Sequence, residues 1–280
     1  EGIIFKTNVH VGVHYDVKNL DYFDAIVLCG GATKTRTLPV KGGQNRNVIQ
    51  AMEFLTKQTK YLYKETQEED IISARDKHVI VIGGGDTGSD CIGTSIRQGA
   101  KSVTNFEITS KPPKNQSSET PWPFWPLKLK TTSSHEEGGD RKWLISTKEF
   151  LTDNDGTLIA LKTINVEWVQ ESDNRLSFRE VEGTEKIWPC DLVLLALGFT
   201  GPETTLSDQL GVKFNRKPTS TTIQYQTNIP HIFSAGDMRR GQSLIVWAIS
   251  EGREVAKCVD YYLMNTSSLQ DKGVGDLPSA

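Results

Sequence analysis

Three glycines with the spacing G-x-G-x-x-G stand directly after the apolar segment 78–82. They are Gly83, Gly85 and Gly88. In a dinucleotide site the first glycine permits a tight turn, the second lets the backbone approach a pyrophosphate, and the third lets a helix pack against the strand. The helix then directs free N–H groups and the positive end of its dipole at the anion. The pattern therefore predicts a pyrophosphate site.

A carboxylate follows these glycines at the separation that a nucleotide site requires. Segment 86–98 is predicted to be a helix that stops at Gly99, and segment 100–108 is predicted to be the next strand. Glu107 stands near the end of that strand, about 20 residues after the loop, where an acid holds a ribose hydroxyl. A lone glycine pattern is weak evidence, because glycine loops also form structural turns. Strand, loop, helix, strand and acid together are specific.

The same carboxylate predicts which nucleotide binds. Glu107 would repel a 2′-phosphate, although Lys111 follows closely and could moderate that repulsion. We therefore expect NADH to be preferred over NADPH by at least about 1 kcal/mol, the scale of one charge interaction at an exposed or partly buried site.

Further apolar strands, similar to the one before the glycine loop, are needed to form the sheet that positions this loop. Three further apolar runs, at 24–32, 191–199 and 231–237, resemble segment 78–82. Continuous runs of this length bounded by glycine suit parallel strands that are covered on both faces. The runs at 24–32 and 191–199 end in small-residue turns of the type that closes a dinucleotide-binding lobe. We predict an α/β protein with two Rossmann-like three-layer lobes, the second inserted into the first.

Two amphipathic helices and a pair of antiparallel strands are also predicted. The first helix covers 48–63, with one face formed by Val48, Met52, Leu55 and Leu62. The second covers 243–263, with one face formed by Ala248, Gly252, Val255, Val259 and Tyr262. The paired strands occupy 158–169 and 175–181.

Composition excludes several classes of function. The chain has 280 residues, of which 36% are hydrophobic and 24% charged, and its net charge of −3 gives no electrostatic case for a nucleic-acid partner. No uncharged apolar run approaches the roughly 20 residues that span a bilayer. We therefore expect a soluble, cytoplasmic protein with neither a nucleic-acid nor a membrane partner.

Metal and dithiol chemistry are not predicted. The four cysteines are too widely spaced for a CxxC redox pair, a zinc knuckle or an iron–sulfur ligand set. His135 is followed by two glutamates, but no second ligand cluster stands at a suitable spacing, and we assign no metal ligand.

Two segments are predicted to be loops from their composition. Segment 111–126 is rich in proline, and segment 132–140 is rich in serine and glycine. Trp122 and Trp125 lie in the first, where packing over the sheet is favoured over shielding of a cofactor.

A second candidate site follows the apolar run near residue 231. Gly236 and Asp237 stand at the end of this predicted strand and precede the helix 243–263. An aspartate there can accept a hydrogen bond from a polyol hydroxyl, while the helix N–H groups face an electron-rich ring edge. The residues alone leave a surface ion pair with Arg239 and Arg240 as an alternative.

Long stretches of the chain resemble the pyridine-nucleotide and flavin region of glutamate synthase, particularly the NADH-dependent single-chain type. The matching stretches are 24–39, 79–91, 99–113, 121–126, 147–150, 178–183, 191–203 and 235–253. The resemblance implies one lobe for FAD and one for NAD(P)H, with hydride passing from nicotinamide to FAD. Electrons would then pass through iron–sulfur clusters to FMN, where glutamine-derived ammonia and 2-oxoglutarate become glutamate.

The resemblance also implies roles for residues in the NAD(P)H site. The residues around the pyrophosphate would be Gly83, Gly84, Gly85, Asp86, Thr87, Gly88 and Ser89. Glu107 would hold the adenosine ribose, and Gly198 would line the nicotinamide side. No catalytic acid or base is assigned, because the reactive centres belong to the cofactors.

In the flavin site, the resemblance implies that Gly236 and Asp237 bind the ribityl or pyrophosphate portion. Ser243 and Leu244 would offer backbone N–H groups near the isoalloxazine. The family's first flavin-binding glycine loop and its iron–sulfur cysteines have no counterpart in the sequence. We therefore expect a fragment whose partner is the remainder of the synthase, which would carry the iron–sulfur clusters and FMN.

The expected organisation is a partial FAD lobe at 1–72 continued at 201–265, an NAD(P)H lobe at 73–200 and a flexible tail at 266–280. Two alternatives stay open. One is another two-lobe flavoprotein reductase, such as the related region of dihydropyrimidine dehydrogenase. The other is a truncated module that binds NADH and transfers nothing.

Overall fold

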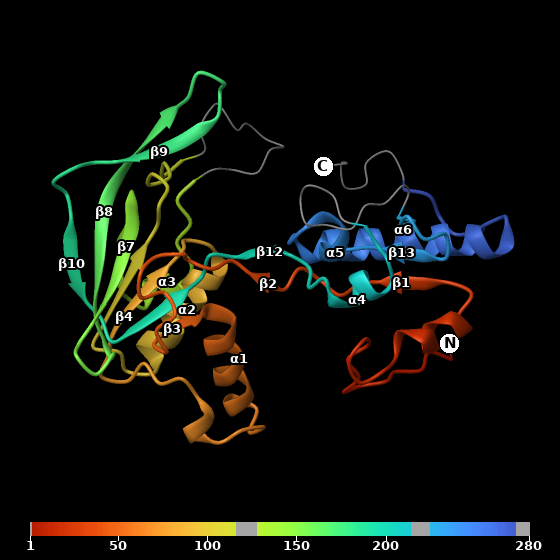
Figure 1. The fold of residues 1–280 in the computed structure, drawn as a ribbon, viewed down its shortest axis with the longest axis horizontal. Helices are drawn as coiled ribbons and strands as arrows, with labels where there is room; N and C mark the ends of the chain where they lie inside the picture. Colours follow the sequence, from red (N-terminus) through yellow and green to blue (C-terminus); the bar gives the residue numbers. More distant parts are fainter. Residues whose placement is uncertain (1, 116–127, 214–224, 273–280) are drawn as a thin grey trace. The chain divides into compact units, whose positions relative to one another are not determined.

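The computed structural model of the protein describes residues 2–115, 128–213 and 225–272. The chain divides into two compact units (Figure 1). Unit 1 combines Glu1–Arg36 with Gly198–Ala280, and unit 2 is the continuous segment Thr37–Leu197. Unit 2 is therefore inserted into unit 1, as the predicted fold class requires.

A five-stranded parallel sheet forms the centre of unit 2. From edge to edge its strands are β3 (Val48–Gln50), β11 (Leu192–Leu195), β4 (His78–Ile82), β5 (Ser102–Phe106) and β6 (Asp140–Lys142). Every neighbouring pair is parallel. The strands before and after the glycine loop are therefore neighbours, and β11 returns from the far end of the insertion to pair with β4.

Strand β4 is buried on both faces. Val79 and Val81 belong to the apolar cluster on one side of the sheet, and Ile80 and Ile82 belong to the cluster on the other. Successive side chains of a strand point to opposite faces, so a strand covered on both sides must be apolar throughout. This explains the uninterrupted run before the glycine loop.

Helices cover one face of this sheet. α1 (Ala51–Leu62) contributes Phe54 and α2 (Asp86–Arg97) contributes Cys91, both fully buried in the same cluster. The end of α2 agrees with the helix predicted at 86–98.

An antiparallel sheet covers the opposite face. Its strands are β7 (Ile145–Thr152), β8 (Leu158–Gln170), β9 (Leu176–Glu180) and β10 (Lys186–Pro189). β8 pairs with β7, β9 and β10, and Phe150, Leu158 and Leu161 face the parallel sheet. Unit 2 thus has three layers, and the predicted antiparallel pair is confirmed.

Two predictions for unit 2 were wrong in detail. Residues 48–50 form strand β3 rather than the start of a helix, because the β-branched pair Val48 and Ile49 aligns with β11. Met52 and Leu62 are then exposed, and the buried face of α1 passes through Phe54. The loop predicted at 132–140 contains the short helix α3 (Ser133–Glu136).

A further turn, η2 (Glu68–Asp70), lies in the connector before β4.

Unit 1 is built on short strands. β1 (Ile26–Leu28) pairs in parallel with β13 (Ile232–Ser234), and β2 (Lys34–Thr35) pairs antiparallel with β12 (Phe199–Gly201). The helical elements are η1 (Val17–Tyr22), α4 (Thr205–Gln209), α5 (Asp237–Arg240) and α6 (Ile245–Met264). Two small clusters, one around Leu28 and Ile232 and one around Phe233 and Val255, supply its apolar core.

The inward face of α6 agrees in part with the predicted one. Its fully buried residues are Glu251 and Val255, with Cys258 and Val259 packed beside them. Ala248 is exposed. Val255, Val259 and Tyr262 of the predicted face pack inward, Tyr262 against Phe233. The buried Glu251 was not predicted, because hydrophobic periodicity cannot detect a carboxylate at an inward position.

The unit boundaries also differ from those expected. Residues 37–72 pack in unit 2 rather than with residues 1–36, because they supply β3 and α1 to the central sheet of unit 2. The second boundary falls at 197/198 instead of 200/201. The tail expected at 266–280 is described only to Lys272, which pairs with Glu254.

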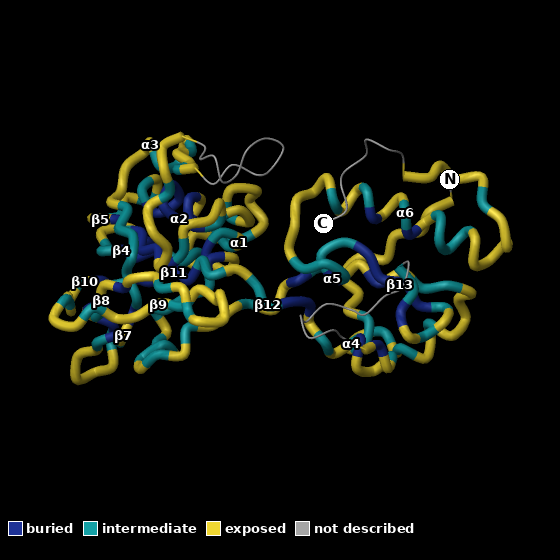
Figure 2. The backbone as a smooth tube through the Cα atoms, turned by 90° about the horizontal axis from the view of Figure 1, so that it is seen from above, coloured by how far each residue is buried: buried dark blue, intermediate teal, exposed yellow. Residues whose placement is uncertain are grey.

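Burial is concentrated in the sheet and α2 of unit 2, as Figure 2 shows. Among the described residues, no helix combines the length and the apolar composition needed to cross a membrane.

Candidate functional site

Two glycines of the loop are required by packing. Gly83 has φ +121°, and a Cβ there would lie 2.2 Å from the carbonyl oxygen of Ala196. A Cβ on Gly88 would lie 2.3 Å from the carbonyl oxygen of Gly83. The first glycine therefore allows the turn beside β11, and the third lets α2 pack directly onto the loop.

Packing within the protein does not require a glycine at the middle position of the loop. Gly85 has φ −80°, which any residue adopts, and its Cβ would meet nothing within 4 Å. It is the N-cap of α2, and no side chain of the described residues caps this twelve-residue helix. Open space in front of uncapped N–H groups is what an anion needs.

A buried amide braces the loop from the neighbouring strand. Asn105 of β5 is 1% exposed, and its Nδ2 donates to the carbonyl oxygens of Val81 at 3.1 Å and Gly83 at 2.9 Å. Asn105 was not among the residues predicted for the site. The sequence gives no distinguishing signal for it, because the strand Ser102–Phe106 also contains the polar residues Ser102 and Thr104.

Glu107 lies at the end of β5, directly beside the loop. A Cβ on Gly84 would fall 2.0 Å from the carboxyl carbon of Glu107, so the glycine makes room for this carboxylate. Arg141 Nη2 donates to Glu107 Oε1 at 3.1 Å, and the two side chains are 16% and 10% exposed. The structure therefore brings the predicted acid and the predicted loop together, and it adds a cation that the sequence analysis did not assign.

Ser89 is the fourth residue of α2, and its side chain makes its contacts within the protein. It is 3% exposed, and its hydroxyl contacts the hydroxyl of Thr132 and, at 3.3 Å, Nδ1 of His135. Thr132 N also donates to His135 Nδ1, at 3.2 Å. Burial lowers the pKa of His135, the charge of Arg141 lowers it further, and Asp86 opposes the shift. The hydroxyl of Ser89 thus joins α2 to α3, while Asp86 and Thr87 begin the helix.

The second candidate site lies in unit 1, where a tight turn joins β13 to α5. Gly236 has φ +67°, and a Cβ there would meet nothing within 4 Å. Asp237 Oδ1 accepts hydrogen bonds from Ser243 N at 3.1 Å and Ser243 Oγ at 2.9 Å. Leu244 is the exposed N-cap of α6.

Gly198 lies in the same unit, at the point where the chain leaves unit 2. It has φ +75°, and its carbonyl oxygen accepts from Arg36 N at 3.0 Å. The predicted residues therefore form two groups: one in unit 2 around the glycine loop and Glu107, and one in unit 1 around Gly236.

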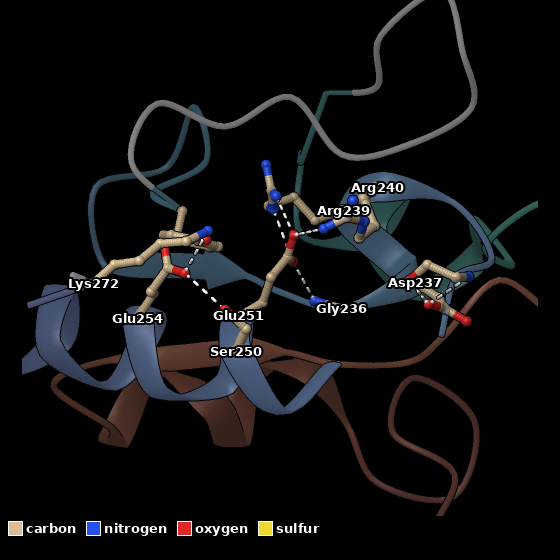
Figure 3. Close-up of polar contacts among 10 residues, drawn as sticks. Gly236, Asp237, Arg239, Arg240, Ser250, Glu251, Glu254 and Lys272 are labelled. Atoms are coloured by element: carbon tan, nitrogen blue, oxygen red, sulfur yellow. Dashed lines mark hydrogen bonds and ion pairs between the residues drawn. The ribbon is translucent and has the colours of Figure 1, made fainter. Parts of the chain in front are cut away.

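A buried carboxylate holds the turn at Gly236 (Figure 3). Glu251 of α6 is 2% exposed, and its Oε2 accepts from Gly236 N at 2.7 Å and Arg239 Nε at 2.9 Å. Its Oε1 accepts from Arg239 Nη2 and, at 3.2 Å, from Arg240 Nη1. One side chain of α6 therefore ties together the end of β13 and both arginines of α5.

This network replaces the surface ion pair that the sequence left open. Arg239 lies over the ring of Tyr225 at 4.7 Å, and Arg240 over that of Trp247 at 3.9 Å. Burial alone would raise the pKa of Glu251. The hydrogen bonds and charge of Arg239, the Gly236 N–H and the charge of Arg240 outweigh burial and hold the pKa below its ordinary value.

No metal centre is found in the described part of the chain, where no group of three His, Cys, Asp or Glu side chains could hold an ion. All four cysteines are free, and burial raises the pKa of Cys91 and of Cys190 to about 12. Trp122 and Trp125 lie outside the described residues.

Together these features define a two-lobe α/β fold of the kind found in FAD- and NAD(P)-dependent reductases. The family described as pyridine nucleotide-disulphide oxidoreductase matches residues 3–119 and 148–252, and the chain belongs to this family.

The relatives of the chain include glutamate synthases, in agreement with the resemblance seen in the sequence. The chain is 46% identical over 278 residues to the glutamate synthase [NADPH] small chain of Bacillus subtilis (strain 168), covering 96% of this chain and 56% of that one. It is 42% identical over 286 residues to the glutamate synthase [NADH] of Schizosaccharomyces pombe, covering 98% of this chain and 14% of that one. The resemblance to glutamate synthase is thus confirmed, and the chain spans about half the length of the bacterial small chain.

Solved structures share the fold at low sequence identity. Mycobacterium tuberculosis FprA in complex with NADPH superposes with a TM-score of 0.69 at 17% identity, over 92% of this chain and 68% of that one. T. acidophilum thioredoxin reductase gives 0.54 at 20% identity, over 87% and 66%. These likenesses show the architecture alone.

Proposed function

We propose that the chain is the electron-input part of a glutamate synthase, where it binds NADH and passes hydride to FAD for the reductive synthesis of glutamate. Its relatives carry the name glutamate synthase, and its family is one of nucleotide-dependent oxidoreductases. The observation that carries the proposal is Gly85, which leaves open space before the uncapped N-terminus of α2.

The residues of unit 2 fit a nicotinamide dinucleotide. The N–H groups at the start of α2 can donate to a pyrophosphate, and Gly85 lets the anion approach the backbone. Glu107 stands beside the loop, where its carboxylate can accept from ribose hydroxyls. When bound, the nicotinamide supplies the hydride and FAD accepts it, so the task of the protein is to hold and orient the two rings.

NADH is proposed over NADPH because of Glu107. A carboxylate accepts hydrogen bonds from a free 2′-hydroxyl and repels a 2′-phosphate. The relatives do not decide the choice, since one is named for NADPH and another for NADH.

The residues of unit 1 fit the flavin. Gly236 leaves open space at a strand end, and Asp237 is oriented by Ser243, so that its second carboxylate oxygen can accept from a polyol hydroxyl. The remainder of the synthase, with its iron–sulfur clusters and FMN, is the proposed partner, and the cytoplasm is the proposed compartment.

Replacement of Gly85 by alanine tests the nucleotide site. Because the added methyl group meets no protein atom and φ is ordinary, the free energy of unfolding should stay within about 0.5 kcal/mol. The methyl group occupies the space of the pyrophosphate, so the dissociation constant for NADH should rise at least about tenfold, or 1.4 kcal/mol.

The matched control is Gly252→Ala. This glycine lies on the exposed side of α6, where a Cβ also meets nothing within 4 Å. The control should bind NADH as the wild type does. Unchanged affinity in Gly85→Ala would refute the assignment of the loop. Reduction of a dye acceptor by NADH with added FAD then separates an electron-transfer chain from a module that only binds nucleotide.

A further inference from the structure

We infer that Arg141 is the residue that sets how strongly the site discriminates between NADH and NADPH. The inference rests on the proposed nucleotide site and concerns its specificity. Arg141 lies on β6, opposite Asn105 of β5 in the register of the two strands, and Glu107 follows Asn105 two positions later, on the same side of the strand. Its ion pair with Glu107 is among the most buried in unit 2.

The guanidinium is fixed in place. Nη1 donates to the carbonyl oxygen of Lys130 at 2.9 Å, and Nη2 donates to Glu107. The group also lies over the ring of Trp143 at 5.2 Å, and Lys111 Nζ lies over the same ring at 4.8 Å. Trp143 thus contacts both cations, and one of them, Arg141, pairs with the carboxylate that would meet the ribose.

This cluster retains unused donors. Among the described residues, Nε of Arg141 and Nε1 of Trp143 are buried with no hydrogen-bond partner. Buried donors are normally paired, so these two would gain a partner if a small rearrangement of the covering side chains admitted an acceptor from outside the chain. A phosphate oxygen is such an acceptor, and a guanidinium is the side chain best suited to it.

The two oxygens of Glu107 therefore have different surroundings. Oε1 accepts a hydrogen bond from Arg141, and Oε2 packs against Gly84 of the loop. The carboxylate can accept from a 2′-hydroxyl, while Arg141 weakens its repulsion of a 2′-phosphate. Without Arg141 the bare carboxylate would exclude NADPH. Without the charge of Glu107, the unpaired guanidinium of Arg141 would favour NADPH.

The test measures binding of NADH and of NADPH to the purified chain by calorimetry. Arg141→Gln should raise the dissociation constant for NADPH at least tenfold, which is at least about 1.4 kcal/mol. It should raise the constant for NADH less than threefold, which is less than about 0.7 kcal/mol. Glu107→Gln should shift the ratio of the two constants at least tenfold toward NADPH. Arg141→Lys retains the charge and should restore most of the NADPH binding lost in Arg141→Gln.

The control is Arg179→Gln, which removes the exposed pair with Glu171 in the same unit. It should leave both constants unchanged. Equal losses for the two nucleotides in Arg141→Gln would assign Arg141 a structural role and overturn the inference, as would no change for either. Failure of the wild-type chain to bind any nucleotide would instead refute the proposed function. The fragments 5′-AMP and 2′,5′-ADP provide a second measurement, in which only the latter should respond to Arg141.

Discussion

Replacement of Glu251 by glutamine tests whether a buried carboxylate organises unit 1. The change keeps the shape of the side chain and removes its charge, leaving Arg239 and Arg240 without a counter-ion. Loss of one partner of a buried ion pair costs about 3–5 kcal/mol. The arginine side chains here are 29% and 16% exposed and can partly regain water. We therefore expect a loss of about 2–3 kcal/mol in the free energy of unfolding.

The assay is urea unfolding followed by tryptophan fluorescence, with hydrogen exchange at 232–251 to assign the loss to unit 1. Trp247 lies under Arg240, so its emission should change with this network. The amide of Gly236 donates to Glu251 and should exchange faster in the variant. These two signals separate a local effect from a general loss of stability.

Glu254→Gln is the matched control, one turn along α6. Glu254 accepts from Tyr225 Oη at 2.7 Å and Ser250 Oγ at 3.1 Å, but its side chain is 26% exposed. Its loss should be about 1 kcal/mol. A loss in Glu251→Gln no larger than in this control would refute the view that the buried charge organises the turn.

Three further predictions follow from local geometry. Gly83→Ala places a Cβ against Ala196 at positive φ and should cost about 3 kcal/mol of folding stability, measured by thermal unfolding. The pKa of Glu251 is lower in the folded than in the unfolded chain, so its ionised form adds to the free energy of unfolding above the pKa of an unfolded glutamate. This stabilisation is lost as the pH falls through the folded pKa. The free energy of unfolding should therefore drop in acid, and it should drop less in Glu251→Gln. With pKa values of about 12, Cys91 and Cys190 should resist alkylation at pH 7.5 until unfolding, whereas the exposed Cys29 is modified first, as peptide mass spectrometry would show.

The nucleotide loop could be predicted because its signals are local. The spacing of Gly83, Gly85 and Gly88 directly after an apolar strand is visible within eleven residues of the chain, although the contact that requires Gly83 is made by the distant Ala196. Glu107 follows from the length of one helix and one strand. The apolar strands could be predicted for the same reason, since burial on both faces leaves an uninterrupted hydrophobic run.

Other features depend on contacts between segments far apart in the chain. The strand at Val48 forms because β11, more than a hundred residues later, offers it an edge. Glu251 is buried because Gly236, Arg239 and Arg240 meet it there, and periodicity treats such a residue as solvent-facing. Arg141 was missed because the sequence shows only a cation in a charged segment, with no sign that it reaches Glu107.

The two units hold their candidate sites by different forces. In unit 2, a parallel sheet covered on both faces fixes the loop. Gly85 of this loop faces open space, which no protein atom fills within 4 Å of a Cβ. In unit 1, short strands and small clusters supply less apolar burial, and the turn at Gly236 depends on the charge of Glu251. Apolar packing is insensitive to pH, whereas a buried carboxylate loses its partners when it is protonated. Acid should therefore disturb the turn of the proposed flavin site before the glycine loop of the proposed nucleotide site. Hydrogen exchange across the acid range would measure that order at Gly236 N, which donates to Glu251, and at Gly83 N, which donates to Phe106 O at 2.9 Å.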